Sequence, residues 1–132
     1  MNILPQLLFL SAESTLNSRE ENLRATQRLM LRLDEAGYRY KRVKGVYKDS
    51  IEDSFCIVLD NANQVSDLNF IAFSNFNQES TLYVDANRKA QLQFSSGDIQ
   101  ELGSFKAIEK SEVKNHSSYT YDVTLDQYYA CI

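Results

Sequence analysis

Residue types that mark many common functional sites are scarce in this sequence of 132 residues. It has two cysteines and one histidine, and neither cysteine lies at ligand spacing from another metal-binding side chain, so we expect neither a disulfide framework nor a metal site. The P-loop, GxGxxG, HExxH and CxxC motifs are absent. His116 has no serine or cysteine nucleophile motif beside it, and we expect it on the surface. The sequence therefore predicts no metal and no cofactor, and any chemistry must come from how a substrate is positioned.

A large excess of one charge is also lacking, because 14 basic residues balance most of the 18 acidic ones and the net charge is −4. The basic cluster at 41–44 is too short to neutralise a phosphate backbone, so we expect no nucleic-acid partner. The apolar run near the N-terminus contains Pro5, lacks a basic start and is too short for a signal peptide or a membrane span. With two free thiols, the sequence predicts a cytoplasmic protein without a membrane partner. The length fits one domain, residues 1–132.

Apolar periodicity predicts two helices and a set of strands. Ser18 and Glu21 match a capping box, and apolar residues at helical spacing continue to a stop at Gly37, so we expect a helix over 18–36. A second apolar stripe at spacings of three and four predicts a helix over 63–77. Strands are predicted at 7–12, 38–47, 54–59, 81–84 and 92–94, with weaker candidates at 104–108 and 119–123.

The predicted order is strand, helix, strand, strand, helix, strand, followed by additional strands. This order is typical of an α+β ferredoxin-like βαββαβ sandwich, here with an additional C-terminal β-hairpin region. Both helices would cover one face of the sheet. Because the other face would also need cover, we expect either the C-terminal hairpins or neighbouring subunits of a homo-oligomer to supply it.

The connection between the second and third predicted strands, GVYKDSIEDSF at 45–55, concentrates side chains that could do chemistry. Tyr47 and Glu52 stand at its two ends and could converge on one pocket. The alternative is an ordinary hairpin, in which Tyr47 packs and the carboxylates of Glu52 and Asp53 are solvated. The residue types alone favour the ordinary hairpin.

The sequence resembles the S-adenosylmethionine lyases of phages, a family long called S-adenosylmethionine hydrolases. The resemblance runs through most of the chain in register. Its matching segments are LSAES at 10–14, Glu21-Asn22, GVY at 45–47, the glutamate before the third strand, STLYVDA at 80–86 and LGSF at 102–105. The resemblance implies a ferredoxin-like, PII-like protomer, a homotrimer, and a substrate pocket between subunits.

By motif match, the resemblance implies that Tyr47 and Glu52 are the catalytic residues. Because the segment between them is shorter than in the family, Asp49 or Asp53 remains an alternative to Glu52. Glu52 would hold the α-ammonium of the substrate, and Tyr47 would contact its sulfonium. The further substrate-binding candidates are Ser11, Ala12 and Glu13, which would frame the adenosine, together with Val46 and Phe105, of which Phe105 is also a candidate for core packing.

The reaction implied by the resemblance is the degradation of S-adenosylmethionine. The carboxylate of the substrate closes a lactone and releases 5′-methylthioadenosine, with homoserine lactone or free homoserine as the second product. In a phage-infected host this reaction would deplete the methyl donor in the cytoplasm and blunt restriction. Two other functions fit the sequence: a non-catalytic PII-like trimer that binds a nucleotide-like ligand, and an inhibitor that docks on a host protein through a sheet edge.

Overall fold

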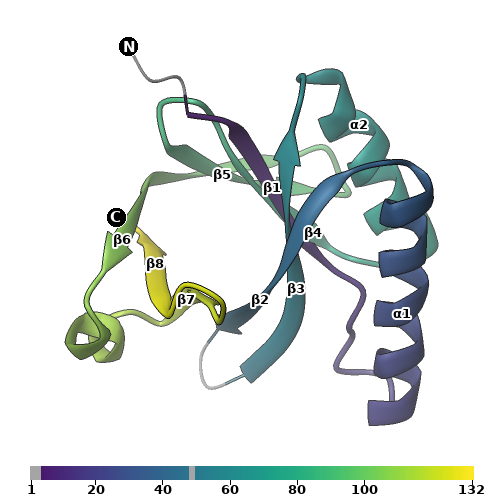
Figure 1. The fold of residues 1–132 in the computed structure, drawn as a ribbon, viewed down its shortest axis with the longest axis horizontal. Coiled ribbons are helices and arrows are strands. Elements are labelled where there is room, and N and C mark those ends of the chain that lie inside the picture. The colour runs from purple at the N-terminus through teal and green to yellow at the C-terminus, as the bar shows by residue number, and fades with distance from the viewer. Residues whose placement is uncertain (1–3, 48–49) are drawn as a thin grey trace.

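The computed structural model describes residues 4–47 and 50–132. In these residues, eight antiparallel strands form a closed barrel in the order β1-β3-β2-β7-β8-β6-β5-β4, and helices α1 and α2 lie together outside one side of it (Figure 1). The strands are β1 (Gln6–Ser11), β2 (Arg39–Tyr47), β3 (Ser50–Leu59), β4 (Ser80–Val84), β5 (Lys89–Phe94), β6 (Ile99–Ile108), β7 (Ser118–Asp122) and β8 (Gln127–Cys131). The helices are α1 (Arg19–Glu35), α2 (Asn63–Phe70), the π-helix η1 (Ile71–Asn75) and the 3-10 helix η2 (Lys110–Asn115).

The ferredoxin-like sandwich predicted from the sequence is wrong, because the sheet closes on itself. Strands β4, β1, β3 and β2 lie side by side in that order. Strand β7 then pairs with the other edge of β2, β5 pairs with the other edge of β4, and β6 and β8 join the two ends. Strand β8, which the sequence analysis did not predict, is essential to this closure. Pairing both edges satisfies backbone groups that an open sheet would leave to solvent.

Closure also changes what covers the second face of the sheet. We expected that face to be covered by C-terminal hairpins or by neighbouring subunits, but it lines the barrel interior, where side chains from opposite walls pack together. Because this face is covered within the barrel, it gives no reason to expect an oligomer. The barrel core consists of Phe9, Val43, Cys56, Val84, Ala90 and Phe105.

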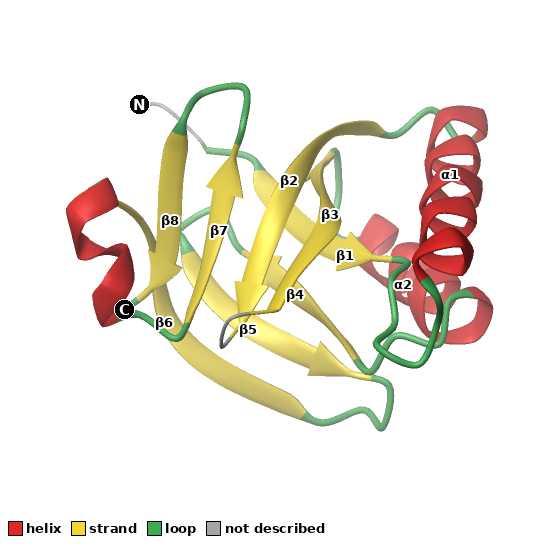
Figure 2. Ribbon diagram, turned by 90° about the horizontal axis from the view of Figure 1, so that it is seen from below, coloured by secondary structure: helices red, strands yellow, loops and turns green. Residues whose placement is uncertain are grey.

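Alternation along β3 divides its side chains between two cores. Phe55 and Ile57 face the helices and belong to one core with Leu29 and Leu33 of α1, whereas Cys56 faces the barrel interior. Both α1 and α2 pack outside the barrel wall, next to β1 and β3 (Figure 2). Within the described residues, no helix has the length and apolar character needed to cross a membrane.

Both ends of α1 follow the signals read from the sequence. Ser18 Oγ accepts a hydrogen bond from Glu21 N (3.1 Å), and Glu21 Oε1 accepts one from Ser18 N (2.9 Å). Gly37 follows the helix with a φ of 76°, a left-handed conformation that glycine adopts without steric cost. The prediction of this helix is confirmed. The second predicted helix is present as α2, but its last turns are the π-helix η1.

Candidate functional site

The barrel interior becomes polar toward the end where β2 turns into β3. Glu52, Ser54 and Cys56 lie at alternate positions along β3, so their side chains share the interior face of the barrel. Ser11, the last residue of β1, lies opposite Ser54, and Gly45 of β2 lies opposite Glu52. The apolar core of the barrel therefore ends in a layer of hydroxyl and carboxyl groups, which we call the polar end layer: Ser11, Gly45, Glu52 and Ser54.

The register of the β2–β3 hairpin brings Tyr47 and Glu52 to the same face of the sheet. Tyr47 pairs with Ser50, and Gly45 pairs with Glu52, so Tyr47 and Glu52 are diagonal neighbours. Diagonal neighbours have Cα atoms roughly 7 to 8 Å apart, within reach of an aromatic side chain. The Tyr47 side chain is 59% exposed at the rim of the barrel. Asp49, the alternative to Glu52, lies outside the described residues.

The carboxyl group of Glu52 titrates near neutral pH. Loss of hydration raises its pKa from 4.5 to about 7, and repulsion from Glu13 adds to this effect, while the Ser11 hydroxyl partly opposes it. By its surface area, however, Glu52 is an exposed residue at the barrel end, so solvent screens this carboxyl group. Within the described residues, Glu52 makes no salt bridge, whereas Asp53 is paired with Lys44 and lies 3.6 Å from Arg42. Glu52 is therefore the better placed of the two to accept a cation.

Glu13 is fixed by hydrogen bonds at each of its polar groups. Its backbone N–H donates to Ser11 Oγ (3.0 Å), its backbone carbonyl accepts from Gln78 Nε2 (2.9 Å), and its Oε2 accepts from Asp53 N (3.0 Å). Burial raises the pKa of the Glu13 carboxyl, and the hydrogen bond from Asp53 N opposes that rise. The π-helix η1 contributes to this arrangement, since it ends just before Gln78 and its Ala72 carbonyl accepts from Gln78 N (3.0 Å).

Asn22 of α1 holds the next residue of the same segment. Its Oδ1 accepts from Ser14 N (2.9 Å) and its Nδ2 donates to Ser14 O (3.0 Å), so the amide clamps one backbone unit from both sides. The capping box at Ser18 starts the helix that carries Asn22. The segment between β1 and α1 is thus pre-organised before any ligand binds.

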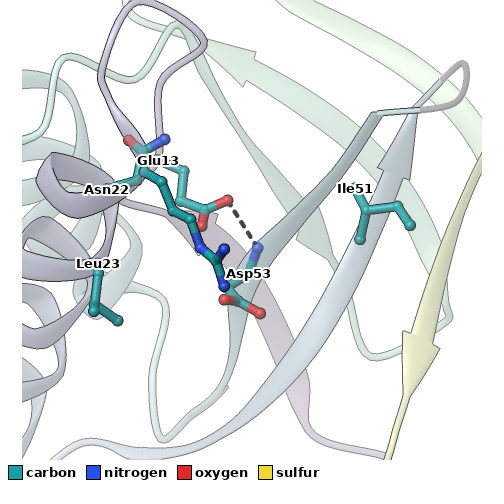
Figure 3. A pocket seen from close by; sticks show the side chains of 6 residues that line it. Glu13, Asn22, Leu23, Ile51 and Asp53 are labelled. Carbon is teal, nitrogen blue, oxygen red and sulfur yellow. Dashed lines mark hydrogen bonds between the residues drawn. The ribbon is translucent and has the colours of Figure 1, made fainter.

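An open cleft of about 480 Å³ lies between this segment, the start of α1 and β3. In Figure 3, Glu13 and Asp53 face each other at its centre, Asn22 and Leu23 come from α1, and Ile51 lies farther along β3. The cleft and the polar end layer lie on opposite faces of β3 and meet where β1 ends. The cleft is lined by Glu13, Arg19, Asn22, Leu23, Ile51 and Asp53.

The other candidates from the sequence do not line this cleft. Ala12 is buried in the core beneath the helices. Val46 pairs with Ile51 and faces outward with it. Phe105 lies in the barrel core, where its ring stacks on Tyr129 with centroids 5.1 Å apart. Phe105 thus has the packing role that the sequence also allowed.

Several residues at this site were not singled out as site candidates from the sequence. Ser54 and Gln78 carry no motif of their own, and Gly45 and Asn22 were noted only as parts of matching segments. Their importance follows from strand register and from contacts between distant segments. Within the described residues, no group of three metal-binding side chains could hold a metal ion.

Comparison with protein families gives one match that covers nearly the whole chain. The model of the S-Adenosylmethionine lyase family matches residues 8–132. A search of curated proteins found no match to the sequence. The matched range contains the β1–α1 segment, the β2–β3 hairpin and every strand of the barrel except the first two residues of β1.

Proposed function

Because the chain belongs to the S-adenosylmethionine lyase family and its substrate is S-adenosylmethionine, we propose that it acts by intramolecular lactonisation. A carboxylate oxygen of the substrate attacks its own Cγ, the bond from Cγ to sulfur breaks, and the bonding electrons go to sulfur. The products are 5′-methylthioadenosine and homoserine lactone. No proton needs to be transferred in this step, and no water is consumed.

A sparse site is sufficient for this reaction. The leaving group is a neutral thioether that is already activated as a sulfonium, so the protein need not supply a nucleophile. Opposite charges on the carboxylate and sulfonium cancel in the transition state, which a site with little water favours. Holding the substrate in a folded conformer removes much of the orientational cost. The protein therefore has to bind and orient the amino-acid part of the substrate.

The diagonal pair of Tyr47 and Glu52 on one face of the barrel end is the observation that supports this assignment most directly. In our proposal, the Glu52 carboxylate binds the α-ammonium of the substrate, and the Tyr47 hydroxyl or ring contacts the sulfonium. The fixed segment from Ser11 to Glu13 frames the adenosine. Phe105 and Val46 do not line the cleft, and our proposal gives them no direct contact with the substrate.

A homo-oligomer, and a trimer in particular, is also part of the proposal. The observation that supports an oligomer is the exposed apolar surface around the cleft. Leu23 and Ile51 line the cleft and are 57% and 68% exposed, and Leu16 of the β1–α1 segment is 94% exposed. A neighbouring copy seated there would exclude water from the cleft. Light scattering at micromolar concentration should give a trimer, and Leu23→Glu should shift it toward the monomer. A monomeric parent protein would contradict this part of the proposal.

The proposed biological role is depletion of the methyl donor in the cytoplasm of a phage-infected host, which would blunt restriction. Its support is the resemblance of the sequence to phage enzymes. Expression in a bacterial host should lower the cellular S-adenosylmethionine pool, and a Glu52→Gln variant expressed to the same level should not.

The experiment that tests the activity is incubation of the purified protein with S-adenosylmethionine, followed by chromatography of the products. We expect 5′-methylthioadenosine and homoserine lactone to appear together in equal amounts. A protein that binds S-adenosylmethionine but releases neither product would instead be the non-catalytic binding module that the sequence also allowed.

A further inference from the structure

Ser54 carries a buried hydroxyl whose hydrogen-bonding capacity is not used within the described residues. The residue is only 8% exposed, and among residues 4–47 and 50–132 its Oγ has no hydrogen-bond partner. Among the described residues, Thr26 Oγ1 is the one side-chain polar atom that is both completely enclosed and without a partner. Ser54 Oγ is therefore not completely enclosed. A small polar group approaching from the barrel end can therefore reach Ser54 Oγ.

The neighbouring hydroxyl of the polar end layer is already occupied. Ser11, which pairs with Ser54 across the strands, donates its hydroxyl proton to Asp53 O (2.8 Å) and accepts from Glu13 N (3.0 Å). Ser11 therefore has no proton left for a ligand. Ser54 Oγ has no such partner within the described residues, so its proton is available to a ligand.

Gly45 leaves the space in front of Ser54 open. A Cβ atom at position 45 would lie 3.3 Å from Ser54 Oγ and 3.9 Å from Glu52 Cγ. Any larger residue at this position would stand between the hydroxyl and the carboxylate. Because Gly45 has no side chain, it does not fill the position next to both Ser54 Oγ and Glu52 Cγ.

From this arrangement we infer that Ser54 and Glu52 together bind the amino-acid end of the substrate, with the Ser54 hydroxyl donating to one oxygen of its carboxylate. This inference rests on the proposed function. Residues two apart on a strand are about 6.6 to 6.8 Å apart. A carboxylate and an ammonium on one carbon, with hydrogen bonds of about 2.8 Å on either side, span roughly 8 to 9 Å between the two protein atoms, and the longer Glu52 side chain can supply the difference.

The two contacts would have different consequences for the reaction. Glu52 holds the ammonium, and Ser54 holds one carboxylate oxygen, so the other oxygen of the carboxylate is directed toward Cγ. A single neutral donor orients the carboxylate without neutralising the charge that makes it a nucleophile. Ser54 is thereby a substrate-contacting residue that selects for a carboxylate at this position.

The test compares two ligands that differ in that carboxylate. Binding of S-adenosylmethionine and of decarboxylated S-adenosylmethionine, which cannot form a lactone, is measured by calorimetry for the parent protein and for Ser54→Ala. Both ligands are titrated in a Tyr47→Phe background, in which turnover of S-adenosylmethionine is lowered, and with short mixing times. We expect Ser54→Ala to weaken binding of S-adenosylmethionine by roughly tenfold and to leave the decarboxylated ligand within about twofold.

Two further variants separate the hydroxyl contact from effects on folding. Ser54→Thr keeps the hydroxyl and should restore most of the lost affinity, whereas Gly45→Ala should weaken binding by filling the space while leaving Ser54 in place. Thr26→Val is the matched control, because it removes another buried hydroxyl without a partner from the core beneath the helices. It should leave both affinities and the turnover rate unchanged.

The outcomes distinguish this inference from the proposed function. If Ser54→Ala weakens both ligands equally, or neither, then Ser54 does not bind the carboxylate and the inference is refuted, whatever the activity. If the parent protein binds S-adenosylmethionine but releases no 5′-methylthioadenosine, the proposed function is refuted, and the ratio of affinities still decides the role of Ser54. A parent protein that binds neither ligand refutes both.

Discussion

Replacing Glu52 by glutamine should change how the stability of the protein depends on pH. In the folded protein the pKa of Glu52 is raised from 4.5 to about 7, mainly by loss of hydration and secondly by Glu13. Between these two pH values the folded state keeps a proton that the unfolded chain releases. The contribution of Glu52 to the free energy of unfolding therefore falls as pH rises from about 4.5 to about 7, and is constant above that.

The magnitude follows from the same two values. The full difference between 4.5 and about 7 corresponds to roughly 3 kcal/mol. Because the side chain remains in contact with solvent, screening reduces this figure, and we expect about 1 kcal/mol. Glutamine has a similar shape and does not titrate. The variant should thus match the parent near pH 4.5 and exceed it by about 1 kcal/mol at pH 8.

The assay is urea denaturation of both proteins at several pH values from 4.5 to 8, with the difference in unfolding free energy plotted against pH. Glu21→Gln is the matched control, and its difference from the parent should stay constant over this pH range, because the pH dependence due to Glu21 lies below pH 4.5. Hydrogen bonds from the Ser18 backbone and then the Ser18 side chain lower the pKa of Glu21. Its stabilising contribution is therefore present above pH 4.5 and is lost as pH falls. A flat difference curve for Glu52→Gln would refute the claim that this carboxyl is held in a poorly hydrated site.

Three other perturbations test separate parts of the structure. Tyr47→Phe should keep the fold while lowering the single-turnover rate roughly tenfold to a hundredfold, and Tyr47→Ala should lower it further; rates equal to the parent for both would make the hairpin an ordinary one. Gln78→Ala should lower kcat/KM while leaving the melting temperature nearly unchanged, and should add little in a Glu13→Ala background, because the bond to the Glu13 backbone carbonyl acts by positioning the Glu13 side chain, which that background lacks; additive losses would contradict this. Asp122→Ala should cost about 2 kcal/mol in urea denaturation, because it removes a buried carboxylate that accepts hydrogen bonds from Lys41 Nζ, Thr124 N and Leu125 N; an unchanged midpoint would contradict that role.

Local patterns in the sequence were sufficient for α1 and for the presence of the β2–β3 hairpin, although β3 begins at Ser50 and not at Ser54 as predicted. The capping box at Ser18 and the glycine at 37 act within a few residues of the helix ends, so they can be recognised without knowledge of the fold. The hairpin register likewise depends on neighbouring segments. It places Tyr47 and Glu52 on one face of the sheet, in agreement with the expectation that they could converge.

The barrel could not be predicted in this way, because its closure depends on pairing between distant strands. The segment that forms β8, QYYAC, has no clear alternation and follows the polar turn after Asp122. Its partners β6 and β7 are also short or irregular in pattern, and β6 pairs with β5 through a bulge at Ala90 and Gln91. Without β8, the same set of elements reads as an open sheet.

The positions of the residues that complete the site also depend on contacts between segments that are distant in the sequence. Ser54 lies within an apolar run, and only the register against Ser11 of β1 shows that it belongs to the polar end layer. Gln78 reaches Glu13 across 65 residues of sequence. Neither contact leaves a pattern in the neighbouring sequence, so a single sequence could not reveal them.

The origin of one oxygen atom in the product is the most direct test of whether the protein degrades S-adenosylmethionine by lactonisation. Lactonisation takes the γ oxygen of the homoserine product from the carboxylate of the substrate, whereas hydrolysis at Cγ would take it from water. The reaction is run in water enriched in oxygen-18, and the products are analysed by mass spectrometry with fragmentation to locate the label. For lactonisation we expect 5′-methylthioadenosine to form and the γ oxygen to carry no label. Later opening of the lactone by water would label only the carboxyl group. Label at the γ oxygen, or no 5′-methylthioadenosine at all, would contradict lactonisation.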